Sequence, residues 1–179
     1  MEWNDIYDEN RKLTGRVHLR GTSWGQGEYG LVVCVWVYDG NGRVLLTRRA
    51  PEKSFAGTWE NSGGAAKAGE DSLTAIQREL FEETGIRAEK SQFRFLRTTR
   101  DKNAFFDHYC LRWQGELSEI VLLPGETDDV RWCTFPEIHE MIEKRKICTI
   151  IADQFLMEEP TLKASSEGLS DSGDAAGKQ

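Results

Sequence analysis

The chain has 179 residues with a formal net charge of −7 at pH 7, and 39% of its residues are hydrophobic and 30% charged. This composition is typical of a globular protein with one sizeable core. The acidic balance argues against nucleic acid as a partner, because phosphate contacts need a basic face. No apolar run approaches the roughly 20 residues of a membrane span, and the polar opening MEWNDIYDENRK is no signal peptide, so no membrane partner is expected.

The first third of the chain predicts strands. Trp3 to His18 has the pattern of a short hairpin, and a glycine-rich link (21–30) follows it. Residues 31–38, LVVCVWVY, form an almost continuous apolar run, which predicts a central strand covered on both faces. A strong turn signal at 39–42 leads into 43–49, the expected hairpin partner of that strand.

The middle of the chain predicts a loop and then a helix. Residues 50–64 have proline, several glycines and no hydrophobic period, so they are expected to form a loop with Trp59 as its anchor. A helix is expected from Ser72 to Thr84. Asp71 is suited to be its N-cap and Gly85 to follow its last turn.

The remaining elements complete a mixed α/β pattern. From Lys163 the chain is rich in Ser, Gly, Asp and Ala, which predicts a disordered tail (163–179). Residues 1–162, with the hairpin 1–20 included, are therefore expected to form a single domain. Between the helix 72–84 and the tail we expect strands at 93–99, 104–113 and 130–135 and a loop at 114–128. We also expect a helix from Pro136 to about Lys144 and a last helix from Ile147 to Glu158.

The four cysteines, Cys34, Cys110, Cys133 and Cys148, are widely spaced and form no C-x-x-C motif. This spacing argues against a disulfide scaffold or a zinc site and favours a reducing cytoplasm. Cys34 and Cys110 lie inside apolar runs and are expected to be buried. His108 is expected to make a structural hydrogen bond rather than to bind metal.

The predicted helix 72–84 carries an unusual set of carboxylates. Glu79, Glu82 and Glu83 fall within an arc of roughly 100° when each residue turns the helix by about 100°. Like charges at this spacing repel, and Arg78 offsets only part of the repulsion. A hard divalent cation would remove it, since Mg²⁺ and Mn²⁺ prefer carboxylate oxygens. The alternative is an acidic helix face exposed to solvent.

The same segment, GAAKAGEDSLTAIQRELFEETGI (64–86), resembles the Nudix box of the Nudix hydrolase superfamily. Its fixed positions are all present. The resemblance implies an α/β/α sandwich with a central mixed sheet and hydrolysis of a nucleoside diphosphate linked to a further group X. Mg²⁺ or Mn²⁺ would be the cofactor. The matching residues are Gly64, Glu70, Arg78, Glu79, Leu80, Glu82, Glu83, Gly85 and Ile86.

The resemblance also assigns roles at the site. Glu79, Glu82 and Glu83 would be metal ligands, Gly64 would lend its carbonyl, and Glu70 would be a further ligand or an orienting residue. Arg78 would hold the glutamates in position. Outside the box, Glu126 is the favoured general base, because it lies in the loop where relatives keep a catalytic glutamate. The alternatives for that base are Glu116, Glu119, Asp128 and Asp129.

Other side chains are weaker candidates for substrate contacts. Arg48, Arg49 and Lys53 follow an apolar strand and could meet phosphates, although strand alternation sends Arg48 and Arg49 to opposite faces. Five aromatic residues could stack on a base, although core packing is the commoner role for such spacings. They are Phe55, Trp59, Phe105, Phe106 and Tyr109.

Two other functions compete with hydrolysis of a small-molecule nucleotide or diphosphate. The run LLTRRAPEKSFAGTWENSGG resembles isopentenyl-diphosphate isomerases, a branch of the superfamily. Yet Gly63 stands where that branch has a cysteine, and Ala65 and Gly30 stand where it has histidines. The other rival is a non-catalytic nucleotide-binding module, which the intact box disfavours. Many relatives dimerise, so the resemblance makes a homodimer a candidate assembly.

Overall fold

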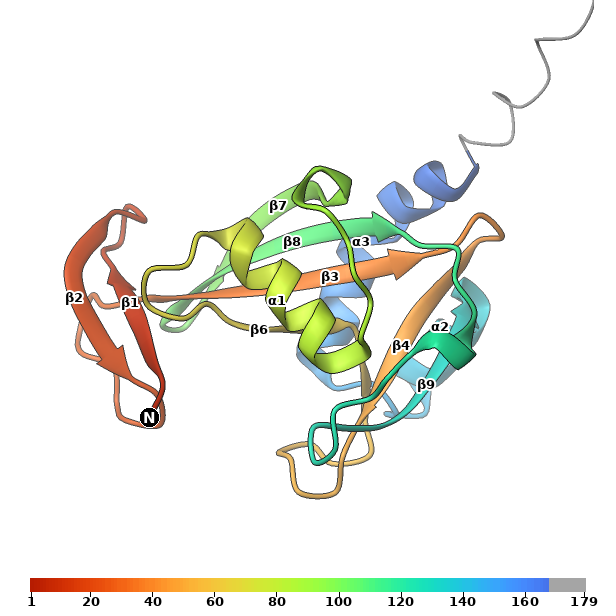
Figure 1. The fold of residues 1–179 in the computed structure, drawn as a ribbon, viewed down its shortest axis with the longest axis horizontal. Coiled ribbons are helices and arrows are strands. Elements are labelled where there is room, and N and C mark those ends of the chain that lie inside the picture. Colours follow the sequence, from red (N-terminus) through yellow and green to blue (C-terminus); the bar gives the residue numbers. More distant parts are fainter. Residues whose placement is uncertain (168–179) are drawn as a thin grey trace, which may run out of the picture.

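In the computed structural model, which describes residues 1–167, a mixed β-sheet lies between helices on its two faces (Figure 1). The strands are β1 (Trp3–Tyr7), β2 (Leu13–Leu19), β3 (Gly30–Tyr38), β4 (Arg43–Arg49), β5 (Trp59–Glu60), β6 (Ser62–Ala65), β7 (Arg94–Asp101), β8 (Ala104–Arg112) and β9 (Thr127–Thr134). The helices are α1 (Ser72–Thr84), α2 (Phe135–Glu143) and α3 (Thr149–Glu167), with short 3-10 helices η1 (Lys90–Gln92) and η2 (Leu117–Glu119).

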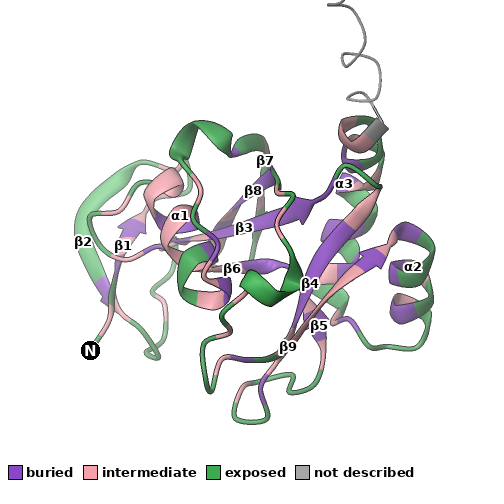
Figure 2. Cartoon of the chain, turned by 45° about the vertical axis from the view of Figure 1, so that its right-hand side comes forward, coloured by how far each residue is buried: buried purple, intermediate pink, exposed green. Residues whose placement is uncertain are grey.

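Strand β3 is the centre of the sheet. The strand order is β5-β4-β3-β8-β7, while β6 pairs with β3 and β9 pairs with β4. β3 and β8 run parallel over nine residue pairs, and the other pairs are antiparallel. Eight of the nine residues of β3 are buried, and Figure 2 shows this strand almost wholly purple. The apolar run at 31–38 therefore forms the doubly covered strand that it predicts.

Side chains alternate between the two faces of β3 and build two apolar cores. On one face Val33 and Val35 pack with Ile76 and Leu80 of α1. On the other face Trp36 packs in a cluster with residues of α2 and α3. This layering confirms the predicted α/β/α sandwich with a central mixed sheet.

The pairing around β4 differs from the expected hairpin. β3 and β4 meet at Tyr38 and Val44 only, and β4 then pairs with β9 from Arg43 to Arg49. In addition, β5 and most of β6 fall within the expected loop 50–64. β6 reads Ser-Gly-Gly-Ala, which has no intrinsic strand preference, and it is a strand because it pairs with four residues of β3.

Helix α3 is longer than predicted. It extends to Glu167, so it includes the first residues of the segment 163–179 expected to be disordered. The helix continues past Pro160 because Leu162 is wholly buried in the core, and the Lys163 ammonium lies 2.8 Å from a Glu159 carboxylate oxygen. The rest of the predicted tail, 168–179, lies outside the described residues.

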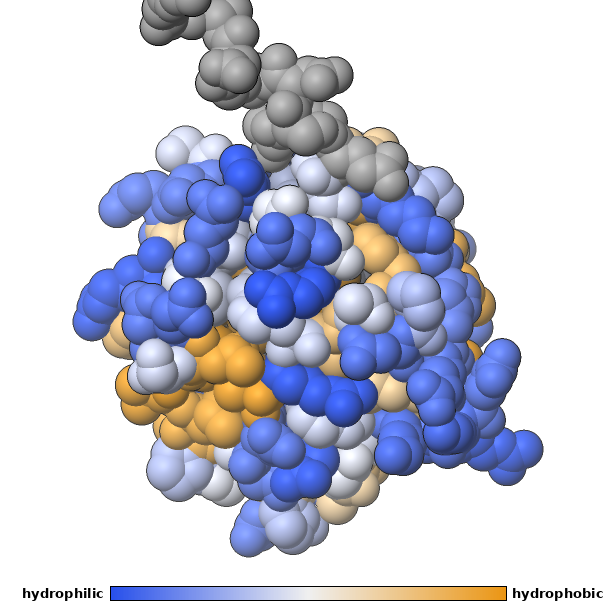
Figure 3. Space-filling view, turned by 90° about the vertical axis from the view of Figure 1, so that its right-hand side faces the viewer, coloured by the Kyte–Doolittle hydropathy of each residue, from blue (hydrophilic) through white to orange (hydrophobic). Residues whose placement is uncertain are grey.

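Figure 3 shows one face of the molecule, which is mostly hydrophilic and has apolar side chains grouped among polar ones. Within residues 1–167, no helix combines the length and apolar character needed to cross a membrane.

His108 lies in the core between the sheet and α3, where its side chain is fully buried. Its Nε2 lies 2.8 Å from Thr99 Oγ1, and its Nδ1 lies 3.5 Å from Cys34 Sγ. Burial, together with the charge of Arg97, lowers the pKa of His108 to about 4. The imidazole therefore has the structural role expected for it, in its neutral form.

This pKa predicts a loss of stability in acid. Above pH 6.5 His108 is neutral in both states; as the pH falls from 6.5 to about 4, the unfolded chain takes up the proton first, so the free energy of unfolding decreases. The full effect is about 3 kcal/mol. Denaturant unfolding at pH 7 and pH 4 should show a smaller loss for His108→Gln than for wild type, with His139→Gln as control. Equal losses in all three proteins would contradict the prediction.

Candidate active site

Helix α1 begins and ends at the residues predicted for it. Asp71 is the N-cap, and its side chain accepts a hydrogen bond from the backbone N–H of Thr74. Gly85 ends the helix with φ of 73°, and its N–H donates to the carbonyl of Phe81 at 2.8 Å. Ile76 and Leu80 of α1 are buried against the sheet. Their packing fixes the rotation of the helix and turns its carboxylate face toward β6.

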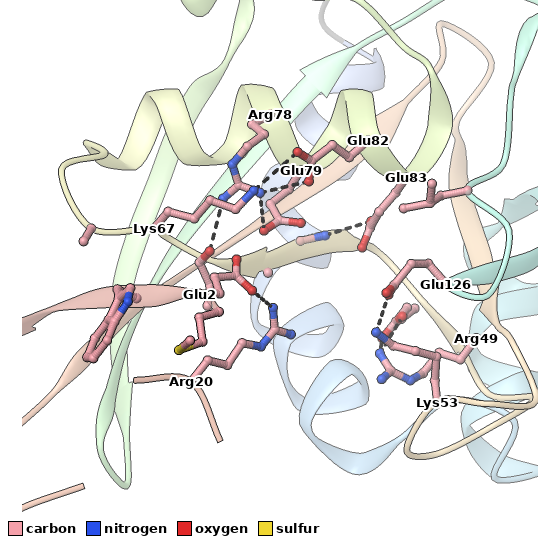
Figure 4. A pocket seen from close by; sticks show the side chains of 18 residues that line it. Glu2, Arg20, Arg49, Lys53, Lys67, Arg78, Glu79, Glu82, Glu83 and Glu126 are labelled. Atoms are coloured by element: carbon pink, nitrogen blue, oxygen red, sulfur yellow. Dashed lines mark hydrogen bonds and ion pairs between the residues drawn. The ribbon is translucent and has the colours of Figure 1, made fainter. Parts of the chain in front are cut away.

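A cavity of about 800 Å³ lies beside this carboxylate face. Six of the predicted site residues line it: Gly64, Arg78, Glu79, Glu82 and Glu83 from the box, and Glu126 from the loop before β9. Figure 4 shows the box glutamates on α1, with Glu126 beside Glu83. The structure therefore brings together residues that lie more than 60 positions apart in the sequence.

Arg78 is the centre of an ion-pair network. Its Nε and Nη2 bind the two oxygens of Glu70 at 2.7 and 2.8 Å. Its Nη1 donates to Glu79 Oε1 at 2.8 Å and to Glu82 Oε2 at 3.1 Å. Its Nη2 also reaches the carbonyl of Ala65 at 3.2 Å. Arg78 thus contacts three carboxylates, and these anions raise its own pKa.

Glu70 does not line the cavity. Both of its oxygens bind Arg78, and Oε2 also accepts a hydrogen bond from the backbone N–H of Lys67 at 2.8 Å. These bonds lower the pKa of Glu70, with the Arg78 hydrogen bond as the main cause. Of the two roles predicted for it, this geometry favours an orienting residue behind Arg78 over a metal ligand.

Glu83 lies in surroundings that disfavour its negatively charged form. Burial raises its pKa well above the usual range, and the nearby charges of Glu60 and Glu79 raise it further. The backbone N–H of Gly63, 3.2 Å from Oε2, donates a hydrogen bond to Glu83, and this bond offsets part of the effect of burial. Burial likewise raises the pKa of Glu79. A site with so much unfavourable negative charge favours a bound cation.

The two glycines beside these glutamates allow β6 to approach closely. A Cβ on Gly63 would lie 2.3 Å from the carbonyl oxygen of Val33, and one on Gly64 would lie 2.5 Å from the carboxylate of Glu79. Contacts this short do not occur in proteins, so only glycine fits at Gly63 without a shift of the backbone.

Four residues occupy the side of the cavity opposite α1. Arg49 Nη1 donates to both oxygens of Glu60 at 2.8 Å, and the Lys53 ammonium pairs with Glu126. All four line the cavity. Glu60 was not predicted, because its segment looked like a loop without hydrophobic period. Strand β5 is formed only by its pairing with β4, a long-range contact.

Several candidates are excluded from the cavity by their contacts. Arg48 points elsewhere and pairs with Asp128 at 2.7 Å and with Asp129 at 3.7 Å. This confirms that only one of Arg48 and Arg49 reaches the site. The other proposed bases, Glu116 and Glu119, do not line the cavity either, nor do the aromatic residues Phe55, Trp59, Phe105, Phe106 and Tyr109.

The site fits a divalent cation in its chemistry, although it is not arranged as a finished metal centre. Within residues 1–167 no three His, Cys, Asp or Glu side chains are grouped closely enough to hold a metal ion. Arg78 Nη1 donates to both Glu79 and Glu82. Glu79 and Glu83 nevertheless both line the cavity.

Comparisons with known proteins agree with this geometry. Residues 28–150 match the family model of the NUDIX domain. A Nudix hydrolase of Listeria monocytogenes is 32% identical over 142 residues, which cover 78% of this chain and 83% of that relative. An isopentenyl-diphosphate Delta-isomerase of Pectobacterium atrosepticum is 32% identical over 128 residues, covering 70% of this chain and 66% of the isomerase. A crystal structure from Deinococcus radiodurans superposes with a TM-score of 0.67 at 22% identity, covering 80% and 90% of the two chains.

Proposed function

The chain belongs to the Nudix hydrolase family, which acts on phosphoric anhydrides, and we propose that it hydrolyses a diphosphate linkage in a nucleoside diphosphate-X substrate with Mg²⁺ or Mn²⁺. The observation that carries the proposal is the composition of the cavity. Carboxylates suited to a hard cation lie on α1, and cations suited to phosphate, Arg49 and Lys53, lie opposite them.

Each residue of the site has a part in this reaction. Glu79, Glu82 and Glu83, with the carbonyl of Gly64, would hold the divalent cation. When bound, that cation would neutralise charge on the phosphate oxygens and favour attack of water on phosphorus. Arg78 positions the carboxylates and does not itself contact substrate in this scheme.

The opposite side of the cavity would supply the base and the phosphate contacts. We propose Glu126 as the general base that takes a proton from the attacking water. Lys53 pairs with Glu126 and Arg49 pairs with Glu60, so both cations are held at the cavity before substrate arrives. Exchanging the partly exposed Lys53–Glu126 pair for a phosphate contact costs little, because such a pair contributes about 0–1 kcal/mol.

The isomerase is the second candidate, and its sequence similarity is the observation that favours it. Two features of this chain oppose it. Gly63, which stands where the isomerases have a cysteine, has no room for a side chain against Val33. In addition, eleven of the eighteen residues lining the cavity are charged, which suits phosphates better than an apolar five-carbon group.

A substrate screen in ¹⁸O-labelled water tests the function directly. With Mg²⁺ we expect hydrolysis of at least one of the nucleoside triphosphates, ADP-ribose, NADH, nucleotide sugars or dinucleoside polyphosphates. One product phosphate should carry a single ¹⁸O, because water attacks phosphorus. Isopentenyl diphosphate should be unchanged. Formation of dimethylallyl diphosphate from isopentenyl diphosphate would show that the protein is an isomerase. If no substrate reacted, the protein would be assigned as a non-catalytic binding module.

We place this reaction in the cytoplasm, as the four free cysteines favour a reducing compartment. The proposed partner is a small nucleotide or diphosphate, and a homodimer is the assembly that the resemblance suggests.

A further inference from the structure

The N-terminal hairpin formed by β1 and β2 reaches the cavity although it lies outside residues 28–150, the part that matches the family model. Three residues of the hairpin region line the cavity: Trp3 in β1, and Glu2 and Arg20, which flank β1 and β2. We call these three residues the hairpin wall. Figure 4 shows Glu2 and Arg20 on the side of the cavity away from Arg49, Lys53 and Glu126, with the box glutamates between.

The hairpin wall is fixed directly to the box segment. The backbone N–H of Ala68 donates to the carbonyl of Trp3 at 2.8 Å, and the side-chain amide of the buried Asn4 donates to the carbonyl of Ala66 at 2.7 Å. The N–H of Gly69 donates to an oxygen of Asp5 at 2.8 Å. Three successive residues of β1 therefore bind the loop that leads to the catalytic helix.

The other end of the hairpin is anchored as well. The guanidinium of Arg11, in the turn between β1 and β2, binds both oxygens of Asp107 on β8. Asp107 is buried, and it also accepts hydrogen bonds from Thr98 and Ser72. Contacts at both ends hold the hairpin as a rigid part of the site rather than as a movable flap.

The chemistry of the hairpin wall suits a nucleoside. Trp3 is 44% exposed, and a large aromatic ring at a cavity rim offers a face on which a base can stack. Arg20 Nη1 lies 2.5 Å from Glu2 Oε2. That pair leaves a carboxylate oxygen and several N–H groups for hydroxyl groups and base edges. None of the three residues offers the enclosed apolar surface that a hydrocarbon group needs.

We propose that the hairpin wall is the nucleoside subsite of this enzyme, in which Trp3 stacks on the base and the Glu2–Arg20 pair binds polar groups of the nucleoside. The diphosphate then extends across the box glutamates toward Arg49 and Lys53. This inference rests on the proposed hydrolase function and adds the part of the substrate that the hairpin recognises.

The test compares two kinds of ligand by calorimetry with Mg²⁺ present. Methylenediphosphonate carries only the non-hydrolysable diphosphate group, whereas the α,β-methylene analogues of ADP, GDP and UDP carry the same group with a nucleoside. At least one nucleotide analogue should bind wild type more tightly than methylenediphosphonate. Trp3→Ala should lower the affinity for that analogue about tenfold, which is within the range for loss of one base–aromatic stack. The affinity for methylenediphosphonate should stay unchanged. Trp3→Phe should retain most of the affinity.

The matched control is Val17→Ala, which removes an exposed apolar side chain from the same hairpin outside the cavity and should change neither affinity. Any purification tag belongs at the C-terminus, away from Trp3. If no analogue bound more tightly than methylenediphosphonate, or if Trp3→Ala weakened both kinds of ligand equally, the nucleoside subsite would be refuted while the diphosphate site stood. If no ligand bound wild type, both proposals would fail.

Discussion

Replacing Glu83 with glutamine is expected to lower kcat by roughly 10²-fold or more, because the substitution removes one metal-binding charge and keeps the size of the side chain. The folded protein should not suffer. Burial and the charges of Glu60 and Glu79 raise the pKa of Glu83, so its ionised form destabilises the fold at neutral pH. The free energy of unfolding of Glu83→Gln should therefore equal or exceed that of wild type.

Three measurements separate this effect from simple damage. Turnover is compared in wild type, Glu83→Gln and Glu143→Gln, where Glu143 is an exposed glutamate on α2 remote from the cavity. Denaturant unfolding without metal gives the stability. Unfolding with Mg²⁺ at a hundredfold excess over Kd should show a gain of about 2.7 kcal/mol for wild type and a smaller gain for Glu83→Gln. Wild-type turnover in Glu83→Gln would remove the metal assignment.

The part of the site that could be read from the sequence is the part formed by neighbouring residues. Asp71 and Gly85 cap α1 through contacts within a few residues, and the period of the glutamates fixes their common face. Likewise the apolar run of β3 predicts a buried strand whatever its neighbours are. Each of these features is determined within about one helical turn or one strand of sequence.

The rest of the site depends on long-range pairing, for which the sequence carries no local signal. β6 is a strand because Gly63 and Gly64 allow it to lie against β3 and Glu79. Glu60 reaches the cavity only because β5 pairs with β4. Trp3 reaches it because β1 binds the loop at 66–69, which is more than 60 residues away. No periodicity or propensity within those segments indicates their partners.

The choice of Glu126 as the general base also depends on long-range contacts. Five acidic residues before and within β9 are candidate bases, and all five carry the same functional group, a carboxylate. Sequence position alone favours Glu126 among them. In the structure the N–H of Ala50, just after β4, donates to the carbonyl of Glu126 at 3.0 Å and brings this residue to the cavity. Asp128, two residues later, instead binds Arg48 outside it.

Glu126→Gln is accordingly expected to lower kcat by about 10²–10⁴-fold, the usual contribution of a general base, with a smaller change in KM. Glutamine keeps the length of the side chain but cannot accept the proton of the attacking water. The decisive measurement is the split between kcat and KM, because removal of the base should lower kcat while substrate binding is largely retained. Asp128→Asn is the matched control from the same segment and should retain near wild-type turnover, since its partner is Arg48.

Two outcomes would assign Glu126 a different role. A Glu126→Gln enzyme whose KM rises while kcat stays near the wild-type value would show that Glu126 acts by positioning Lys53, its partner in the ion pair, for phosphate. An equal loss in Asp128→Asn would mean that the segment moves on substrate binding and that Asp128 enters the cavity. Because Glu126 alone of the five candidates lines the cavity in the described structure, we expect the large loss of kcat only in Glu126→Gln.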